Sequence, residues 1–262
     1  VIVFFCLMIL RPPRSTQSRS SAASDVYKRQ ALKKKYPEDA DGIDKARRIH
    51  ASVAEKVREL DIPAGTDAGP VSEGIIRALP YSLLADACRQ AWIEVMGNEP
   101  GVDLETALKS FVADEPLPEV GKDDQDILPM FLRPAVTGYL RALREANVIP
   151  EESVQGGGKC PFCSTYPRIA FDSEASRDLI CLLCGRRWRF RRVKCPFCGN
   201  EDHNTLGYFD VEGSEGVRVQ YCSECKHYLK VVDTRNRVAR DAETEDVLSL
   251  NLDAAAQEEG YL

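Results

Sequence analysis

The five residues KCPFC occur twice in this chain of 262 residues, at 159–163 and again at 194–198. Each copy is followed by a second pair of cysteines with the same spacing, CLLC at 181–184 and CSEC at 222–225. Two residues between cysteines let the chain turn tightly, so that both sulfurs can face one metal ion. The pattern indicates an internal repeat, in which a cysteine pair, a strand-rich insert and a second cysteine pair occur twice.

The four pairs predict two metal sites, each with four thiolate ligands in a tetrahedron. We expect neighbouring pairs to combine, because this pairing follows the repeat; an interleaved, cross-braced pairing is the alternative. Gly185 and Gly199 directly follow a second cysteine, where a left-handed residue can close the turn. The predicted ligands are Cys160, Cys163, Cys181 and Cys184 in the first site, and Cys195, Cys198, Cys222 and Cys225 in the second.

We expect two metal ions, one in each site. Zinc and mononuclear iron both accept four cysteines, and the sequence does not distinguish them. Four protein ligands leave no position for water or substrate, so such a site stabilises the fold or carries electrons and is not hydrolytic. An iron–sulfur cluster is less favoured, because its cysteines more often lie in one irregular run. His203 and His227 lie near the second site, where we expect surface or hydrogen-bonding roles.

The composition supports this interpretation of the cysteines. The chain is 44% hydrophobic and 29% charged, which excludes wholesale disorder and a polytopic membrane protein. Ten cysteines are present, and eight of them fall in the four pairs. Paired spacing is typical of metal ligands in a reducing compartment, whereas a disulfide framework usually scatters its cysteines through a small secreted domain.

The N-terminal segment differs from the rest of the chain. Residues 1–10 form an apolar run, which includes Cys6 and is too short to span a bilayer. Basic residues follow this run, whereas in a signal peptide they precede it. The Ser/Arg-rich continuation resembles translated adapter sequence. We therefore interpret residues 1–30 as non-native or disordered, with a membrane anchor as the alternative.

Charge divides the remainder of the chain. The net charge is −8 over 31–158, +5 over 159–240 and −7 over 241–262. Glycines at 156–158 are a natural hinge. The predicted organisation is a helical domain at 31–155, a first metal ribbon at 156–192, a second metal ribbon at 193–240 and an acidic C-terminal segment at 241–262.

The first domain is predicted to be all-α. One helix is indicated by the apolar stripe of Ala46, Ile49, Val53, Val57 and Leu60. Further helices are expected to start near Pro80 and Pro134, and after an Asp103 N-cap, with a loop over 115–126. Cys88 lies on one apolar face, as a buried thiol, and His50 lies beside another. The domain has no recognisable catalytic motif, so we expect no enzymatic activity.

A basic stretch lies between the two predicted ribbons. Five arginines and one lysine fall within residues 186–194, interleaved with Trp188 and Phe190. This composition is compatible with a nucleic-acid-binding stripe. A solvated strand edge, or one that docks an acidic protein surface, is the preferred interpretation. Eight thiolates and two divalent ions would also lower the charge of 159–240 to about +1.

In its cysteine-containing segments and its acidic C-terminal segment, the chain resembles the FdhE family of formate dehydrogenase accessory proteins. The matching segments are CPFC at 160–163, CLLCGRRW at 181–188, RVKCPFCGN at 192–200 and YCSECKHYLK at 221–230. The acidic stretch DVLSLNLDAAAQEEGY at 246–261 matches as well. There the alternation of Leu248, Leu250 and Leu252 favours an extended segment before a helix-prone alanine run.

The resemblance implies a helical domain followed by two rubredoxin-like domains, with the eight paired cysteines as metal ligands. It also implies a cytoplasmic protein that binds the formate dehydrogenase catalytic subunit during maturation, as a chaperone does, without catalytic residues of its own. Two other hypotheses remain open at this point. One is a rubredoxin-like redox protein with iron in the four-cysteine sites, and the other is a nucleic-acid-binding zinc-ribbon protein.

Overall fold

The computed structural model divides into two compact units, one within residues 1–64 and 78–146 and the other within 65–77 and 147–262. Residues 1–29 lie outside the described part of the chain, so the interpretation of 1–30 stays a prediction. The predicted glycine hinge is described only at residues 157 and 158. The described residues are 30, 33, 40–62, 74–113, 115–121, 124–147, 157–235 and 238–262.

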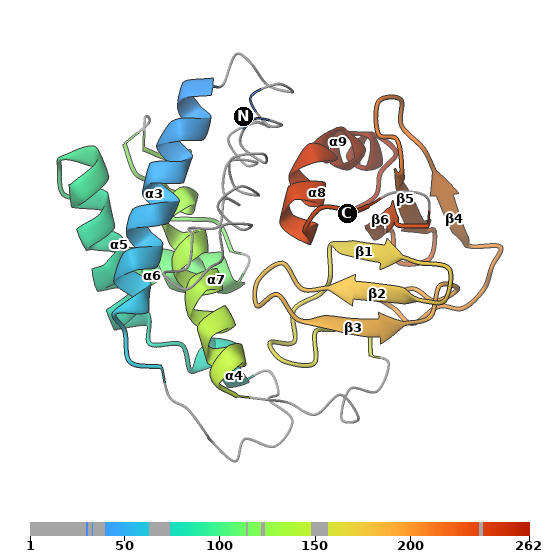
Figure 1. Cartoon of the computed structure of the whole chain (residues 1–262), viewed down its shortest axis with the longest axis horizontal. Helices are drawn as coiled ribbons and strands as arrows, with labels where there is room; N and C mark the ends of the chain where they lie inside the picture. The colour runs from blue at the N-terminus through green and yellow to red at the C-terminus, as the bar shows by residue number, and fades with distance from the viewer. Residues whose placement is uncertain are drawn as a thin grey trace. The chain divides into compact units, whose positions relative to one another are not determined.

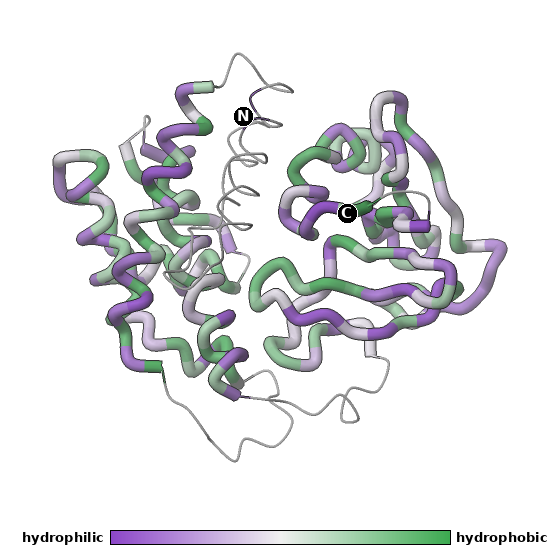
Figure 2. Tube along the Cα trace, in the orientation of Figure 1, coloured by the Kyte–Doolittle hydropathy of each residue, from purple (hydrophilic) through white to green (hydrophobic). Residues whose placement is uncertain are grey.

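The first unit is helical, as the sequence predicts. Its helices are α3 (Ala40–Arg58), α5 (Tyr81–Met96), α6 (Leu104–Ala113) and α7 (Leu128–Ala146). The short helix α4 (Gly74–Arg77) is part of the second unit. Hydrophobic and hydrophilic residues succeed one another along α3 and α7 (Figure 2), as expected of helices that bury one face. No helix in the described ranges is both long and apolar enough to cross a membrane.

Two residues singled out in the sequence, Asp103 and Pro80, correctly mark the starts of helices α6 and α5. The Asp103 carboxylate accepts hydrogen bonds from the backbone N–H groups of Glu105 at 3.3 Å and Thr106 at 3.2 Å, which confirms the predicted N-cap of α6. Pro80 is the N-cap of α5, one position before its first helical residue. Cys88 is fully buried on α5, as predicted.

The predicted start of the last helix is wrong. Helix α7 begins at Leu128, six residues before Pro134, which lies inside it. An interior proline removes one backbone hydrogen bond. The preceding turn offsets this loss by burying Leu128, Phe131 and Leu132 completely. The polar segment before the helix is a loop over its described residues, as expected.

The second unit is built on one six-stranded sheet in the order β3-β2-β1-β6-β5-β4. Within each cysteine repeat, consecutive strands pair antiparallel: β1 with β2 and β2 with β3, then β4 with β5 and β5 with β6. Their bounds are β1 Ile169–Asp172, β2 Arg177–Ile180, β3 Arg187–Phe190, β4 Leu206–Phe209, β5 Val217–Cys222 and β6 Tyr228–Asp233 (Figure 1).

Parallel pairing of β1 with β6 joins the two halves of this sheet, with Ile169 opposite Lys230 and Asp172 opposite Asp233. The sequence suggests two separate ribbons, because each repeat supplies its own hairpin strands. The structure instead merges them into one continuous sheet, which removes one strand edge from each three-stranded half.

One face of the sheet packs against two C-terminal helices, α8 (Ala242–Leu248) and α9 (Leu250–Glu258) (Figure 1). Because side chains alternate along a strand, Ile169, Ile180, Val217, Val219 and Val232 share this face. They form a buried core with Leu252 and Ala256 of α9.

The helical form of the C-terminal segment corrects the expected extended stretch over 248–252. Asp241 caps α8 by accepting the backbone N–H of Thr244 at 3.1 Å. Two carboxylates, Asp246 on α8 and Asp253 on α9, then converge on the ammonium group of Lys230, at 2.6 and 2.7 Å. Lys230 is completely buried. The acidic segment therefore neutralises a buried lysine of β6, a requirement that the leucine alternation does not reveal.

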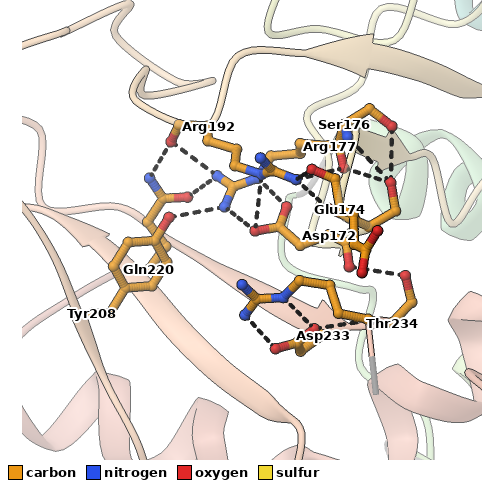
Figure 3. Close-up of polar contacts among 11 residues, drawn as sticks. Asp172, Glu174, Ser176, Arg177, Arg192, Tyr208, Gln220, Asp233 and Thr234 are labelled. Carbon is orange, nitrogen blue, oxygen red and sulfur yellow. Dashed lines mark hydrogen bonds and ion pairs between the residues drawn. The ribbon is translucent and has the colours of Figure 1, made fainter. Parts of the chain in front are cut away.

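The opposite face carries a buried polar network centred on Arg177 of β2 (Figure 3). Its guanidinium forms a two-point ion pair with Asp172 of β1, at 2.7 and 2.9 Å. The same group donates to the Tyr208 hydroxyl at 2.8 Å and to the Gln220 side-chain carbonyl. Since Tyr208 and Gln220 belong to β4 and β5, one side chain links the two halves of the sheet.

Candidate metal centres

The structure brings the eight paired cysteines together as two clusters. Within each cluster all four sulfur atoms lie within 4.8 Å of one another, and no cysteine is shared between clusters. The first cluster contains Cys160, Cys163, Cys181 and Cys184, and the second contains Cys195, Cys198, Cys222 and Cys225. Neighbouring pairs thus combine, as expected, and the cross-braced alternative is excluded.

The separations between sulfurs fit a tetrahedral metal ion. A four-thiolate site with metal–sulfur bonds of about 2.3 Å has tetrahedral edges of about 3.8 Å. Sulfur pairs in the first cluster lie 3.4, 3.5 and 3.6 Å apart, and pairs in the second lie 3.6 and 3.8 Å apart. These distances are too long for disulfides, and all eight cysteines are free.

Each cysteine pair forms the same hydrogen-bonded knuckle. The N–H of the first cysteine donates to the carbonyl five residues later, at 2.8 to 3.0 Å in all four knuckles. Its own carbonyl accepts the N–H of the residue four positions later, at 2.9 to 3.0 Å. Two short hydrogen bonds per pair therefore fix both sulfurs on one side of each turn.

The residue after each second cysteine adopts a left-handed backbone conformation. Gly185 and Gly199, which the sequence singles out, have φ values of 72° and 78°. Ser164 and Lys226 occupy the equivalent positions of the other two knuckles, with φ values of 58° and 59°. Serine and lysine do not predict a left-handed backbone conformation, which costs roughly 1–2 kcal/mol for residues other than glycine. Aligning the four knuckles on their cysteines would have identified Ser164 and Lys226, because they occupy the same position as the two glycines.

A polar side chain close to the sulfurs occurs at the same place in both repeats. The Thr165 hydroxyl lies 3.2 Å from the sulfurs of both Cys163 and Cys181. Asn200, its counterpart in the second repeat, directs its side-chain amide at Cys222, 3.6 Å from the sulfur. Sequence analysis missed both residues. They can donate hydrogen bonds to thiolate ligands and so favour the ionised form that binds a metal.

Cys181 and Cys222 have lowered pKa values. Hydrogen bonds from neighbouring cysteines and from Thr165 hold the pKa of Cys181 well below its ordinary value. Burial acts to raise the pKa of Cys222, but the backbone N–H of Cys225 and the Asn200 amide outweigh it and lower the value to about 7. In both clusters the first cysteine of the second pair is therefore held in an environment that favours its thiolate form.

The two clusters differ in exposure. All four cysteines of the first cluster are buried, each with at most 1% of its surface exposed. In the second cluster Cys198 is exposed and Cys225 is half-buried. Cys198 occupies the position of Cys163 in the repeat. Equivalent ligands thus lie at different depths.

Aromatic rings connect the surroundings of the two clusters. Phe197, between Cys195 and Cys198, stacks on Tyr166 with ring centroids 5.3 Å apart and on His227 with centroids 4.7 Å apart. The His227 ring also bonds to the Cys225 carbonyl at 2.8 Å, the hydrogen-bonding role expected of it. Gly158 packs so closely on the Pro196 carbonyl that a Cβ atom there would come within 1.6 Å of the oxygen. The first ribbon therefore contacts the third knuckle directly.

The remaining candidate residues lie away from the sulfurs. His203 is exposed, as expected. Charges in the arginine-rich strand β3 are partly compensated, because Asp178 faces both Arg187 at 3.7 Å and Arg189 at 3.2 Å. Nucleic-acid binding by this strand stays a hypothesis.

A helical unit followed by a six-stranded sheet with two four-cysteine clusters, each able to hold a metal ion, defines the class of this protein. The C-terminal part of the chain is similar to the FdhE family. The model of the family described as "FdhE, C-terminal domain" matches residues 193–262, the second cluster and the C-terminal helices. This match and the relatives described next confirm the resemblance inferred from the cysteine motifs.

Similar proteins come from distant bacteria. "Protein FdhE homolog" from Aquifex aeolicus is 34% identical over 108 residues, which cover 39% of this chain and 38% of that protein. "Protein FdhE" from Escherichia coli O1:K1 is 30% identical over 125 residues, 44% of this chain and 40% of the relative. The matches thus span less than half the length of these relatives.

A solved structure supports the fold over a longer range. The crystal structure of the FdhE protein from Pseudomonas aeruginosa superimposes with a TM-score of 0.62 and covers 95% of each chain. Its sequence identity is 19%, so the similarity concerns the fold alone.

Proposed function

We propose that this protein is an assembly factor for formate dehydrogenase, which binds the catalytic subunit in the cytoplasm before the enzyme is completed. The proposal is supported by similarity to the FdhE family, and the observation that carries it is the pair of four-cysteine clusters. A closed site gives a small domain a rigid surface without offering a reactive position.

In this role each cluster holds one divalent metal ion, and the ion stabilises the knuckles that surround it. Zinc and iron both fit four thiolates. The protein's own residues supply the rest of each site, since the knuckle hydrogen bonds orient the sulfurs. Thr165 and Asn200 then favour thiolate at one ligand of each cluster.

Co-purification tests the assembly role. We expect the tagged full chain to retain the formate dehydrogenase catalytic subunit under reducing, anaerobic conditions. An unrelated metal-ribbon protein of similar charge serves as the bait control. Equal recovery of the subunit on both baits would overturn the proposed function.

A rubredoxin-like redox role is the second candidate, favoured by the exposure of Cys198. An exposed thiolate ligand brings the metal close to solvent and hence to an external electron carrier. Iron in such a site changes its charge by one electron, whereas zinc does not. Elemental analysis of anaerobically purified protein separates the candidates, since a colourless protein with two zinc ions eliminates this one.

A further inference from the structure

A groove that no cysteine lines lies between the outermost strand β4 and helix α9. It has a volume of about 580 Å³. The half-buried rings of Phe209, Tyr221 and Tyr261 form part of its lining. Four exposed carboxylates complete its rim, two from the turn after β4 and two from the end of α9: Asp210, Glu212, Glu258 and Glu259. We call it the acidic groove.

The four carboxylates have no cationic partner within the described part of the chain. None of them takes part in an ion pair, although many other acidic side chains of this unit do. Glu258 and Glu259 also lie at the C-terminal end of α9, and no basic residue occupies its last turn. Negative charge is unfavourable there, because the helix dipole already makes that end negative. The protein thus holds concentrated negative charge at a position where the fold disfavours it.

The rings of this region can contact cations. The Lys226 ammonium group lies over the Tyr261 ring, 5.7 Å from its centroid. Aromatic faces attract ammonium and guanidinium groups, and the attraction grows when a ligand displaces water from the ring. Carboxylates around aromatic rings are therefore complementary to arginine and lysine side chains.

The groove is lined in part by a strand with an open edge. Strand β4 is the last strand in the sheet order and pairs only with β5 among the described strands. An edge strand presents backbone N–H and C=O groups that can pair with an added extended segment. This edge favours a polypeptide over a small polyamine, which has no backbone to pair.

We propose that the acidic groove binds an extended polypeptide segment in which arginine or lysine residues alternate with apolar ones. Its cations meet the four carboxylates, its apolar side chains cover the rings, and its backbone adds to β4. The inference deepens the proposed assembly role and rests on it for one point, namely that the segment belongs to the catalytic subunit.

Fluorescence polarisation with a synthetic probe tests the groove itself. The probe is a fluorescein-labelled decapeptide of alternating arginine and leucine, titrated with the metal-loaded full chain. Neutralising the rim with Asp210→Asn, Glu212→Gln, Glu258→Gln and Glu259→Gln should weaken binding at least about tenfold. Glu174→Gln with Glu215→Gln, two exposed carboxylates outside the groove, should change it by less than about twofold.

Several outcomes would overturn the groove assignment. Weakening in proportion to the number of charges removed, four in the rim variant and two in the control, would show attraction to the overall charge of the protein. Equal binding of an alternating glutamate–leucine peptide would show that the cations do not matter. Complete competition by spermine at matched charge would assign the site to a polyamine. The rim variant should keep two metal ions and an unchanged or higher Tm, because it relieves repulsion at the end of α9.

The same rim variant distinguishes failure of the groove from failure of the assembly role. If wild type and rim variant retain the catalytic subunit equally well, the assembly role stands and the assignment of the groove's segment to the catalytic subunit is wrong. If the peptide binds the groove but neither protein retains the subunit, the groove stands and the assembly role fails. Loss of both interactions in the rim variant alone supports the whole proposal.

Discussion

The two four-cysteine clusters share the same sequence motif but lie at different depths in the sheet. In the first, every ligand is buried and a threonine hydroxyl bridges two sulfurs. In the second, one ligand is exposed, another is half-buried, and the asparagine is in longer contact with one sulfur. Ligand spacing sets the geometry of each site, whereas the surrounding chain sets how far solvent can reach it.

Removal of one ligand from each cluster is the strongest test of this comparison. We expect Cys181→Ser and Cys222→Ser each to lower the metal content from two ions to one. A structural zinc site contributes on the order of 10 kcal/mol of apparent binding energy, as much as a whole domain has in stability. Each variant should therefore unfold its own half of the sheet, measured as lost amide protection in hydrogen exchange.

Cys88→Ala is the matched control, because Cys88 is a buried cysteine outside both clusters. It should retain two metal ions. Two ions bound by either ligand variant would show that the four-cysteine assignment is wrong for that cluster.

The next largest effect is expected at the link between the two halves. Arg177→Met leaves Asp172 buried without its two-point partner, which should cost on the order of 3–5 kcal/mol in the free energy of unfolding. Loss of the contacts to Tyr208 and Gln220 should also divide thermal unfolding into two transitions, one for each half. Differential scanning calorimetry measures both effects.

Arg235→Met is the control for this experiment, since Arg235 pairs with Asp233 at the surface. Exposed ion pairs contribute little, so the variant should unfold like the wild type. A single transition of unchanged Tm in Arg177→Met would mean that the parallel pairing of β1 with β6 alone unites the halves.

A smaller effect is expected from the hydroxyl beside the first cluster. Thr165→Val keeps the shape of the side chain but removes the donor within 3.2 Å of two sulfurs. Loss of such a hydrogen bond typically weakens metal affinity by about 10–100-fold. Competition with a chelator of known affinity should show this loss in one site of the two.

Thr234→Val provides the comparison, because the Thr234 hydroxyl donates to the Asp172 carbonyl and touches no sulfur. Its metal affinities should match those of the wild type. Equal losses in both variants would assign the effect of Thr165 to packing instead of hydrogen bonding.

The features predicted correctly from the sequence are those formed by residues close together in the chain. Cysteine pairs, the glycines after them and the Asp103 cap act within a few residues, so their spacing reveals them. The Arg177–Gln220 contact joins residues 43 positions apart, and no local pattern reports it. Equally, the helices of 242–258 place Asp246 and Asp253 against the buried Lys230, a contact between distant residues that the local leucine alternation does not report. Residues that unite the sheet were thus missed, whereas those that form each knuckle were found.

The smallest expected effect requires no substitution and tests the difference in depth directly. Zinc-loaded wild-type protein exposed to 4-(2-pyridylazo)resorcinol should release two equivalents in two phases, because a chelator can reach Cys198 but not the buried Cys163. A barrier difference of about 1.4 kcal/mol gives rates tenfold apart.

Iodoacetamide pulses, followed by peptide mass spectrometry, assign each phase to a cluster, and we expect Cys198 and Cys225 to be alkylated during the first phase. One phase, or earlier alkylation of Cys163, would show that exposure in the folded state does not govern release, and local unfolding of the first ribbon would then be the controlling step.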